Sequence, residues 1–132
     1  MATKFTAETI FQDRERCVAP LKIVAMRGAQ DLGREINSYL VRWAQNGGMD
    51  TEDFLIESSC PRFSSGDGKG MLRESVRGVD LFIVVDVGNY NCTYTMFGKE
   101  NMMSPDDHFQ DLKRIIQAAS GKAHRINVVM PI

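Results

Sequence analysis

The hydrophobic positions of the chain change their spacing several times, and each spacing predicts a different element. Residues 21–26 form a short apolar run, which has the length of a buried strand. Gly28 interrupts the run, and residues 31–45 then carry apolar side chains at helical spacing. Gly47 and Gly48 predict the end of this helix, because a glycine past the last turn readily adopts a left-handed backbone. The side chains predicted to share the apolar face are Leu32, Ile36, Tyr39, Leu40 and Trp43.

The middle of the chain predicts a hairpin followed by a buried strand. Residues 54–57 and 71–76 have the length and composition of short strands. Residues 64–70 lie between them and include three glycines in their last five positions, which is typical of a hairpin tip. Gly78 marks a further turn. Residues 81–85 are continuously apolar, as expected of a parallel strand covered on both faces.

The last third of the chain predicts a long connection, a helix and a strand. Residues 86–103 are rich in aromatic side chains and methionines, and unstructured connections of this length are usually functional, partner-bound or mobile. Ser104-Pro105-Asp106-Asp107 predicts a helix start, with a capping serine, a proline in the first turn and two carboxylates at the positive end of the dipole. Gly121 predicts the end of this helix, and residues 126–130 predict another buried strand. The apolar face of the helix is predicted to consist of Phe109, Leu112, Ile115, Ile116 and Ala119.

The order strand, helix, hairpin, strand, helix, strand predicts an α/β fold with right-handed crossovers and helices on both faces of the sheet. The 132 residues, of which 43% are hydrophobic, suffice for one compact domain and are too few for two.

The formal net charge of −1 gives no general attraction to polyanions, so nucleic acid is not an expected partner. No stretch approaches the roughly 20 apolar residues needed to span a bilayer, and we expect a cytoplasmic protein with no membrane partner. Cys17, Cys60 and Cys92 lack the paired spacing of a zinc site or disulfide framework and are predicted to be free thiols.

The stretch from Arg62 to Val85 carries the most specific pattern in the chain. Arg62-Phe63-Ser64 precedes the glycine-rich turn, and Glu74-Ser75-Val76-Arg77-Gly78 leads into the apolar run 81–85. This stretch resembles the N-terminal half-domain of ribose-phosphate diphosphokinases (PRPP synthetases), where a segment of the type Arg-Phe-Ser-Asp-Gly-Glu leads at fixed distance into Glu-Ser-Val-Arg-Gly and a buried strand. The resemblance implies a three-layer phosphoribosyltransferase-like α/β domain, with a mostly parallel sheet, a β-hairpin called the flag and helices on both faces.

The resemblance also predicts how the chain is organised. Residues 1–20, which are weakly periodic and end in Pro20, are expected to be an N-terminal extension, and residues 21–132 to form the domain. Compared with the family, residues 86–103 look like an insertion. The chain stops directly after an apolar strand, and family members contain two related domains, so we expect most of the first domain of a longer two-domain protein.

The activity implied by the resemblance is transfer of the β,γ-diphosphoryl group of ATP, with Mg²⁺, to the anomeric hydroxyl of ribose 5-phosphate. The products are PRPP, which serves nucleotide biosynthesis, and AMP. The family's ribose-phosphate and diphosphate loops belong to the second domain, so the isolated chain is expected to be inactive and to hold no cofactor tightly. Family members assemble through this domain, which makes a homo-oligomer the expected state.

The resemblance assigns two groups of binding residues and no catalytic or metal-binding residue. Phe63, Ser65 and Asp67 match the loop that holds the adenine and ribose of ATP in a neighbouring subunit. The family has Asp and Glu where this chain has Ser65 and Asp67, so contact with ATP is expected to be weakened or altered. Ser75 and Arg77 match positions that help to bind phosphate or ADP at a regulatory site between subunits, and a guanidinium and a hydroxyl suit a phosphate chemically. The alternative interpretations are that the glycines only let a hairpin turn, and that Arg77 forms an ion pair at the turn before Leu81.

Other motifs predict less. Gly66-Asp67-Gly68-Lys69-Gly70 matches neither a P-loop nor a dinucleotide fingerprint, because no Lys-Ser/Thr pair follows it and it leads into a strand. Two other functions stay open at this point: a non-catalytic regulatory or binding relative of the family, favoured by Ser65, and an unrelated receiver-like module. In the second case Asp86, at the end of a buried strand, would be the reactive residue, although a strand-end acid that starts a turn explains it more simply. Asp106, Asp107, His108 and Asp111 resemble a metal-binding cluster, but helix capping explains the first two and His108 lies on the first turn of the helix. His124 is most simply a surface residue before a strand.

Overall fold

The computed structural model describes residues 18–51 and 53–131, so most of the predicted N-terminal extension lies outside the described residues. Its sheet contains four strands in the order β2-β1-β5-β8, and every neighbouring pair is parallel. The α/β fold with a parallel sheet, predicted from the sequence, is confirmed. The strands are β1 (Leu21–Ala25), β2 (Leu55–Ile56), β5 (Asp80–Val84) and β8 (Arg125–Val129).

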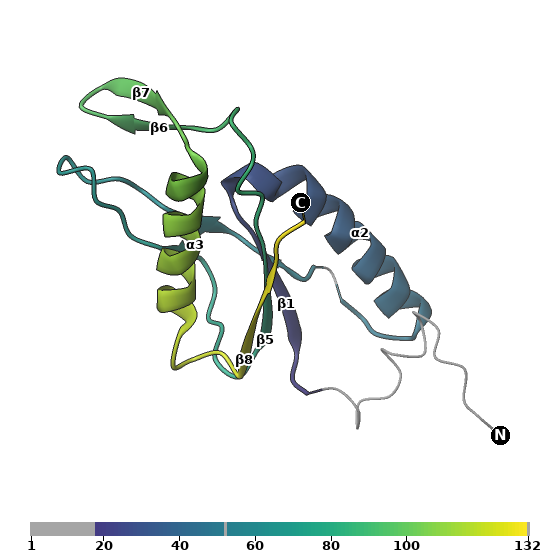
Figure 1. The fold of residues 1–132 in the computed structure, drawn as a ribbon. Helices are drawn as coiled ribbons and strands as arrows, with labels where there is room; N and C mark the ends of the chain where they lie inside the picture. Colours follow the sequence, from purple (N-terminus) through teal and green to yellow (C-terminus); the bar gives the residue numbers. More distant parts are fainter. Residues whose placement is uncertain (1–17, 52, 132) are drawn as a thin grey trace.

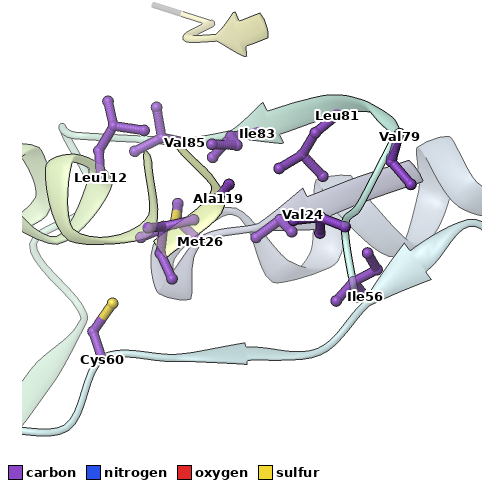
Figure 2. Close-up of a cluster of buried hydrophobic side chains, with 12 residues drawn as sticks. Val24, Met26, Ile56, Cys60, Val79, Leu81, Ile83, Val85, Leu112 and Ala119 are labelled. Carbon is purple, nitrogen blue, oxygen red and sulfur yellow. The ribbon is translucent and has the colours of Figure 1, made fainter. Parts of the chain in front are cut away.

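One long helix covers each face of this sheet, as predicted (Figure 1). The helices are α2 (Gln30–Asn46), which follows the short 3-10 helix η2 (Arg27–Ala29), and α3 (Pro105–Ala119). Successive residues of a strand point to opposite faces. Val24 and Ile83 therefore pack with Leu112 of α3, while Ile23 and Val84 pack on the side of α2. Figure 2 shows the cluster on the α3 side.

Helix α2 begins and ends close to its predicted limits. Gly47 is the C-cap, and Gly48 has a φ of 87°, which is the left-handed glycine expected after the last turn. The predicted apolar face is only partly correct. Ile36 and Leu40 pack against the core, but Leu32 and Tyr39 are exposed. Helical spacing identified the face, but it does not fix the width of the stripe that the sheet covers.

The predicted flag hairpin is present, with shorter strands than the pattern suggested. β3 (Ser58–Ser59) pairs antiparallel with β4 (Met71–Leu72), and an isolated bridge joins Arg62 to Gly68 closer to the tip. Residues 73–76, predicted to continue the second strand, are not part of a strand; residues 73 and 74 form a bend. Gly66 has a φ of 89°, which explains the glycine at the tip.

The segment 86–103 is not an unstructured connection, contrary to the prediction. β6 (Thr93–Met96) and β7 (Lys99–Met102) form a second antiparallel hairpin. Its two turn residues, Phe97 and Gly98, have φ values of 54° and 71°. Such turns usually contain Asn, Asp or Gly at the first position, so phenylalanine there hid the hairpin. In Figure 1 both hairpins project from the same side of the molecule, near the N-terminal end of α3.

Helix α3 starts as predicted but buries a different face. Ser104 and Asp107 form a reciprocal capping box, and Pro105 occupies the first turn. Phe109, predicted to lie on the apolar face, is 45% exposed. His108 and Asp111 are 2% and 3% exposed, so polar side chains take part of the buried face.

Strand β8 lies at the edge of the sheet and is not the buried strand that its composition predicts. Val129, on the α2 face, is 40% exposed because α2 packs on β1 and β2, at the opposite edge of the sheet. Val128, on the α3 face, is 42% exposed. A side-chain ion pair links β8 to β5. The carboxylate of Asp80 in β5 accepts hydrogen bonds from Arg125 Nε at 2.9 Å and Nη2 at 2.7 Å in β8. These bonds lower the pKa of the Asp80 carboxyl, although burial acts in the opposite direction. Within the described residues, no helix is both long and apolar enough to cross a membrane.

Candidate functional site

The tip of the flag hairpin is a tight turn that presents an aromatic side chain to solvent. Phe63 N donates to the carbonyl of Asp67 at 2.7 Å, and Gly66 N donates to the carbonyl of Phe63 at 2.9 Å. These bonds close the turn and leave the Phe63 side chain 51% exposed. Ser65 is also exposed. An exposed aromatic face on a turn with fixed backbone bonds can stack on a planar ligand without reorganisation of the backbone.

Asp67, at the base of this tip, is held from two sides. Its Oδ1 accepts a hydrogen bond from Gly68 N at 2.8 Å, and the same oxygen lies 3.5 Å from Arg114 Nη2. The Asp67 side chain nevertheless remains 74% exposed. The structure thus brings Phe63, Ser65 and Asp67, predicted as one group, onto a single loop with its carboxylate facing solvent.

A buried charged cluster lies beneath the loop. Asp111 of α3 has its Oδ1 at 2.6 Å from Arg114 Nη1 and 3.4 Å from Arg62 Nη2. The side chains of Asp111, Arg62 and Arg114 are only 4%, 6% and 12% exposed. The guanidinium of Arg62 also lies over the ring of Tyr94, 4.6 Å from its centre, which links the flag to β6. This cluster was not predicted from the sequence, although the helical spacing of His108, Asp111, Leu112 and Ile115 is typical of a shared buried face.

The return limb of the flag lies directly on the backbone of α3. A Cβ atom built at Gly70 would lie 2.5 Å from the carbonyl oxygen of Arg114. At the tip, a Cβ at Gly66 would lie 3.2 Å from the sulfur of Met96 in β6. The loop is therefore supported by the helix on one side and approached by the second hairpin on the other.

Ser75 and Arg77 lie together on the wall of a separate pocket of about 500 Å³, formed where the flag returns toward β5. Ser75 Oγ accepts a hydrogen bond from Arg77 N at 3.3 Å. The alternative that Arg77 forms an ion pair at this turn is wrong for the described residues, none of which pairs with its guanidinium. Lys122 lies on the same wall and adds a second positive charge. The lining residues are Gly70, Leu72, Glu74, Ser75, Val76, Arg77, Ala118 and Lys122.

A second pocket, of about 450 Å³, opens at the carboxyl ends of β1 and β2. Its wall mixes Arg27 and Arg73 with Asp53 and Glu57, so it has no clear preference for one charge. Cys60 also lines it, and burial, with a further contribution from Asp111, raises the pKa of this thiol to about 11. A thiol with that pKa stays protonated at neutral pH and is a poor nucleophile.

Cys60 and Cys92 are free thiols, as predicted, and burial raises the pKa of Cys92 as well; Cys17 lies outside the described residues. Three of the four residues that resembled a metal cluster have separate roles. Asp107 caps α3, His108 Nε2 lies 2.6 Å from the carbonyl oxygen of Asn89, and Asp111 pairs with arginines. Across residues 18–51 and 53–131, no three His, Cys, Asp or Glu side chains are arranged to hold a metal ion.

Comparison with protein families decides the assignment of this domain. The model of the N-terminal domain of ribose phosphate pyrophosphokinase matches residues 21–132. The chain belongs to this family. The match begins with the first residue of β1 and includes both hairpins and both long helices.

Among solved structures, this chain is similar to the hypoxanthine-guanine phosphoribosyl transferase of L. donovani. The identity is 16%, the TM-score is 0.48, and the similarity covers 94% of this chain. The chain spans 61% of the length of that protein. No curated protein matches the chain.

Family membership removes the unrelated receiver-like module from the alternatives. Asp86 has the simpler role that its place at a strand end suggested, because its Oδ1 accepts a hydrogen bond from Gly88 N at 3.0 Å and so shapes the turn. His124 is exposed, as expected for a surface residue.

Proposed function

We propose that this chain is the N-terminal domain of a ribose-phosphate diphosphokinase that makes PRPP and AMP from ATP and ribose 5-phosphate. In this reaction the anomeric oxygen of the sugar forms a bond with the β-phosphorus of ATP. The bond between that phosphorus and the oxygen bridging to the α-phosphorus breaks, AMP leaves, and the hydroxyl proton passes to a base. The observation that carries the proposal is the family match over residues 21–132, together with a turn, closed by two backbone hydrogen bonds, that exposes both Phe63 and the Asp67 carboxylate.

The role proposed for the loop is to hold the nucleoside part of ATP. Phe63 supplies an aromatic face for the adenine, and the exposed Asp67 carboxylate accepts hydrogen bonds from ribose hydroxyls. Ser65 adds a neutral hydroxyl where the family has a carboxylate. Since two backbone bonds already fix the turn, little ordering of the loop would oppose binding.

Magnesium would arrive with the triphosphate in this proposal. Within the described residues, no cluster of carboxylates or imidazoles could hold the ion by itself. When bound, Mg²⁺ neutralises charge on the phosphates. We propose that the 132-residue chain binds the nucleotide and forms no PRPP, since the resemblance implies that the ribose-phosphate and diphosphate loops belong to a second domain.

A regulatory role is proposed for the pocket beside Ser75 and Arg77. The Arg77 guanidinium, which has no carboxylate partner among residues 18–51 and 53–131, lines it together with the Ser75 hydroxyl and Lys122, and these groups suit phosphate or ADP. The site would lie between subunits of a homo-oligomer. Titration with ADP tests this role: Arg77→Gln should weaken binding, and Arg73→Gln, which removes an exposed guanidinium outside this pocket, should leave it unchanged. Equal binding by both variants would contradict it.

Calorimetric titration of the purified chain with Mg·ATP tests the nucleotide role. Phe63→Ala should raise the Kd about tenfold, because loss of an aromatic stacking contact is worth roughly 1–1.5 kcal/mol. Phe97→Ala is the matched control, since Phe97 is also exposed, at 76%, and lies at the tip of the other hairpin. Equal Kd values for the wild type and both variants would refute contact between Phe63 and adenine.

A second candidate function is a non-catalytic regulatory subunit that keeps the fold while its ATP loop has weakened. Ser65 favours this candidate, because a hydroxyl cannot replace the charge of the family's carboxylate. A Ser65→Asp/Asp67→Glu variant restores the family residues. A rise in its ATP affinity over the wild type supports a working loop, and an unchanged affinity supports the non-catalytic subunit.

A further inference from the structure

The buried carboxylate of Asp111 is the point where three segments of the chain meet. The side chain lies in the middle of α3, pairs with Arg114 on the same helix, and lies 3.4 Å from Arg62 of the flag. Through the contact of Arg62 with the ring of Tyr94, it also reaches the second hairpin. Among the described residues, Asp111 is the carboxylate that forms ion pairs with both Arg62 and Arg114.

The charges in this cluster balance only when the Asp67 carboxylate is included. Arg62 and Arg114 bring two positive charges into a region where Asp111 supplies one negative charge. Asp67, 3.5 Å from Arg114, supplies the second. A guanidinium that is almost buried is stabilised by each carboxylate near it, so the cluster holds Asp67 toward the helix.

The contact between Arg62 and Asp111 is an ion pair without good hydrogen-bond geometry. Nε and Nη2 of Arg62 are buried and have no hydrogen-bond partner within the described residues. Arg62 is thus held by charge and by the Tyr94 ring, and Asp111 is the carboxylate that pairs with it. Removal of that charge leaves a buried guanidinium with the Tyr94 ring contact but without its paired carboxylate, which makes the buried position of Arg62 less favourable.

We propose that Asp111 is the positioning residue of the nucleotide loop. It holds Arg62, which directly precedes Phe63, and it holds Arg114, which in turn holds Asp67. A single carboxylate in the core therefore fixes both side chains that face the ligand. This inference rests on the proposed function for its ligand, but the order of the loop is measurable without one.

The first test is hydrogen exchange of the backbone amides of residues 63–70 in Asp111→Asn, an isosteric change that removes the charge. We expect exchange there to become at least about tenfold faster, because local opening no longer separates opposite charges. Asp106→Asn is the matched control, since Asp106 is an exposed carboxylate on the same helix. Unchanged exchange at residues 63–70 in Asp111→Asn overturns the proposal, as does an equal increase in the control.

Arg114→Gln keeps the test decisive if Asp111→Asn does not fold. This variant leaves a balanced pair between Asp111 and Arg62 and removes the link to Asp67. Exchange should then rise at residues 66–68, which adjoin Asp67, and stay near the wild-type value at residue 63. Protection at residues 66–68 equal to that of the wild type would overturn the link from Asp111 to Asp67.

The second test is a double-mutant cycle on the Kd for Mg·ATP. Asp111→Asn should raise the Kd at least about threefold in the wild type and much less in a Phe63→Ala/Asp67→Asn background, because the effect passes through these two side chains. An equal effect in both backgrounds indicates a general loss of structure and overturns the positioning role. If the wild-type chain does not bind Mg·ATP, the proposed function fails, while the exchange measurement still decides whether Asp111 orders the loop.

Discussion

The close packing of the flag on α3 leads to a prediction for a single methyl group. In Gly70→Ala, the new Cβ would lie 2.5 Å from the carbonyl oxygen and 2.6 Å from the carbonyl carbon of Arg114. Ordinary contacts between a carbon and a backbone atom are about 3.5 Å, so one side must move by roughly 1 Å. The carbonyl belongs to the interior of α3 and accepts a helical hydrogen bond, so the flag is the part that must move.

The expected loss of stability is about 1–3 kcal/mol, the usual effect of overpacking a tight contact. A replaced glycine also restricts the unfolded chain, which stabilises by about 0.4–1 kcal/mol and offsets part of the loss. Gly88→Ala is the matched control. A Cβ at Gly88 would meet Asp86 Oδ1 at 3.5 Å, which is an ordinary contact, and Gly88 is not among the glycines with positive φ.

Urea unfolding followed by circular dichroism measures both variants. The midpoint of Gly70→Ala should fall by about 1 M, given a slope of roughly 1–3 kcal/mol per M for a domain of this size. Gly88→Ala should keep its midpoint or rise slightly. Equal midpoints for the two variants would refute the packing of the flag on the helix backbone.

Three further predictions concern the stability of the sheet and of helix α3, which support the site. Asp80→Asn should destabilise at neutral pH, and the difference from the wild type should shrink below about pH 4. The reason is that the folded pKa of Asp80 is lowered, so its contribution is present above the unfolded pKa and is lost as the pH falls through the folded value. Ser104→Ala should lower the free energy of unfolding by about 1 kcal/mol through loss of the cap, and Ser120→Ala, at the other end of α3, by less. Ile115→Ala, at a fully buried position, should lower it by about 2–5 kcal/mol.

For each of these predictions, one result of an equilibrium unfolding experiment would contradict it. For Asp80→Asn it is a difference from the wild type that stays constant between pH 7 and pH 3. For the caps it is an equal loss in both serine variants. For Ile115→Ala it is a loss below 1 kcal/mol, the size expected of a surface change.

Much of the fold could be predicted from residues that lie close together in the sequence. The capping box at Ser104 and the glycine after α2 depend on residues within one turn, so their pattern is visible along the chain. The apolar run of residues 81–85 predicted a parallel strand covered on both faces, and β5 pairs parallel with β1 and β8. The same reasoning failed for β8, because an apolar run does not show whether a strand lies at the centre or the edge of a sheet.

The support of the candidate site depends on contacts that the sequence order does not reveal. Arg62 and Asp111 lie far apart along the chain, and each is a residue type usually found in solvent. Their burial follows from the position of the flag on α3, which is a tertiary feature. The second hairpin was missed because Phe97 occupies a turn position with positive φ that most residues avoid.

The most direct test of the central claim is a crystal structure of the chain with Mg²⁺ and a non-hydrolysable ATP analogue. We predict that the adenine stacks on Phe63 at about 3.5–4 Å and that the ribose hydroxyls lie within hydrogen-bond distance of Asp67. A nucleotide bound in the pocket at the ends of β1 and β2, with Phe63 left in solvent, would contradict this account.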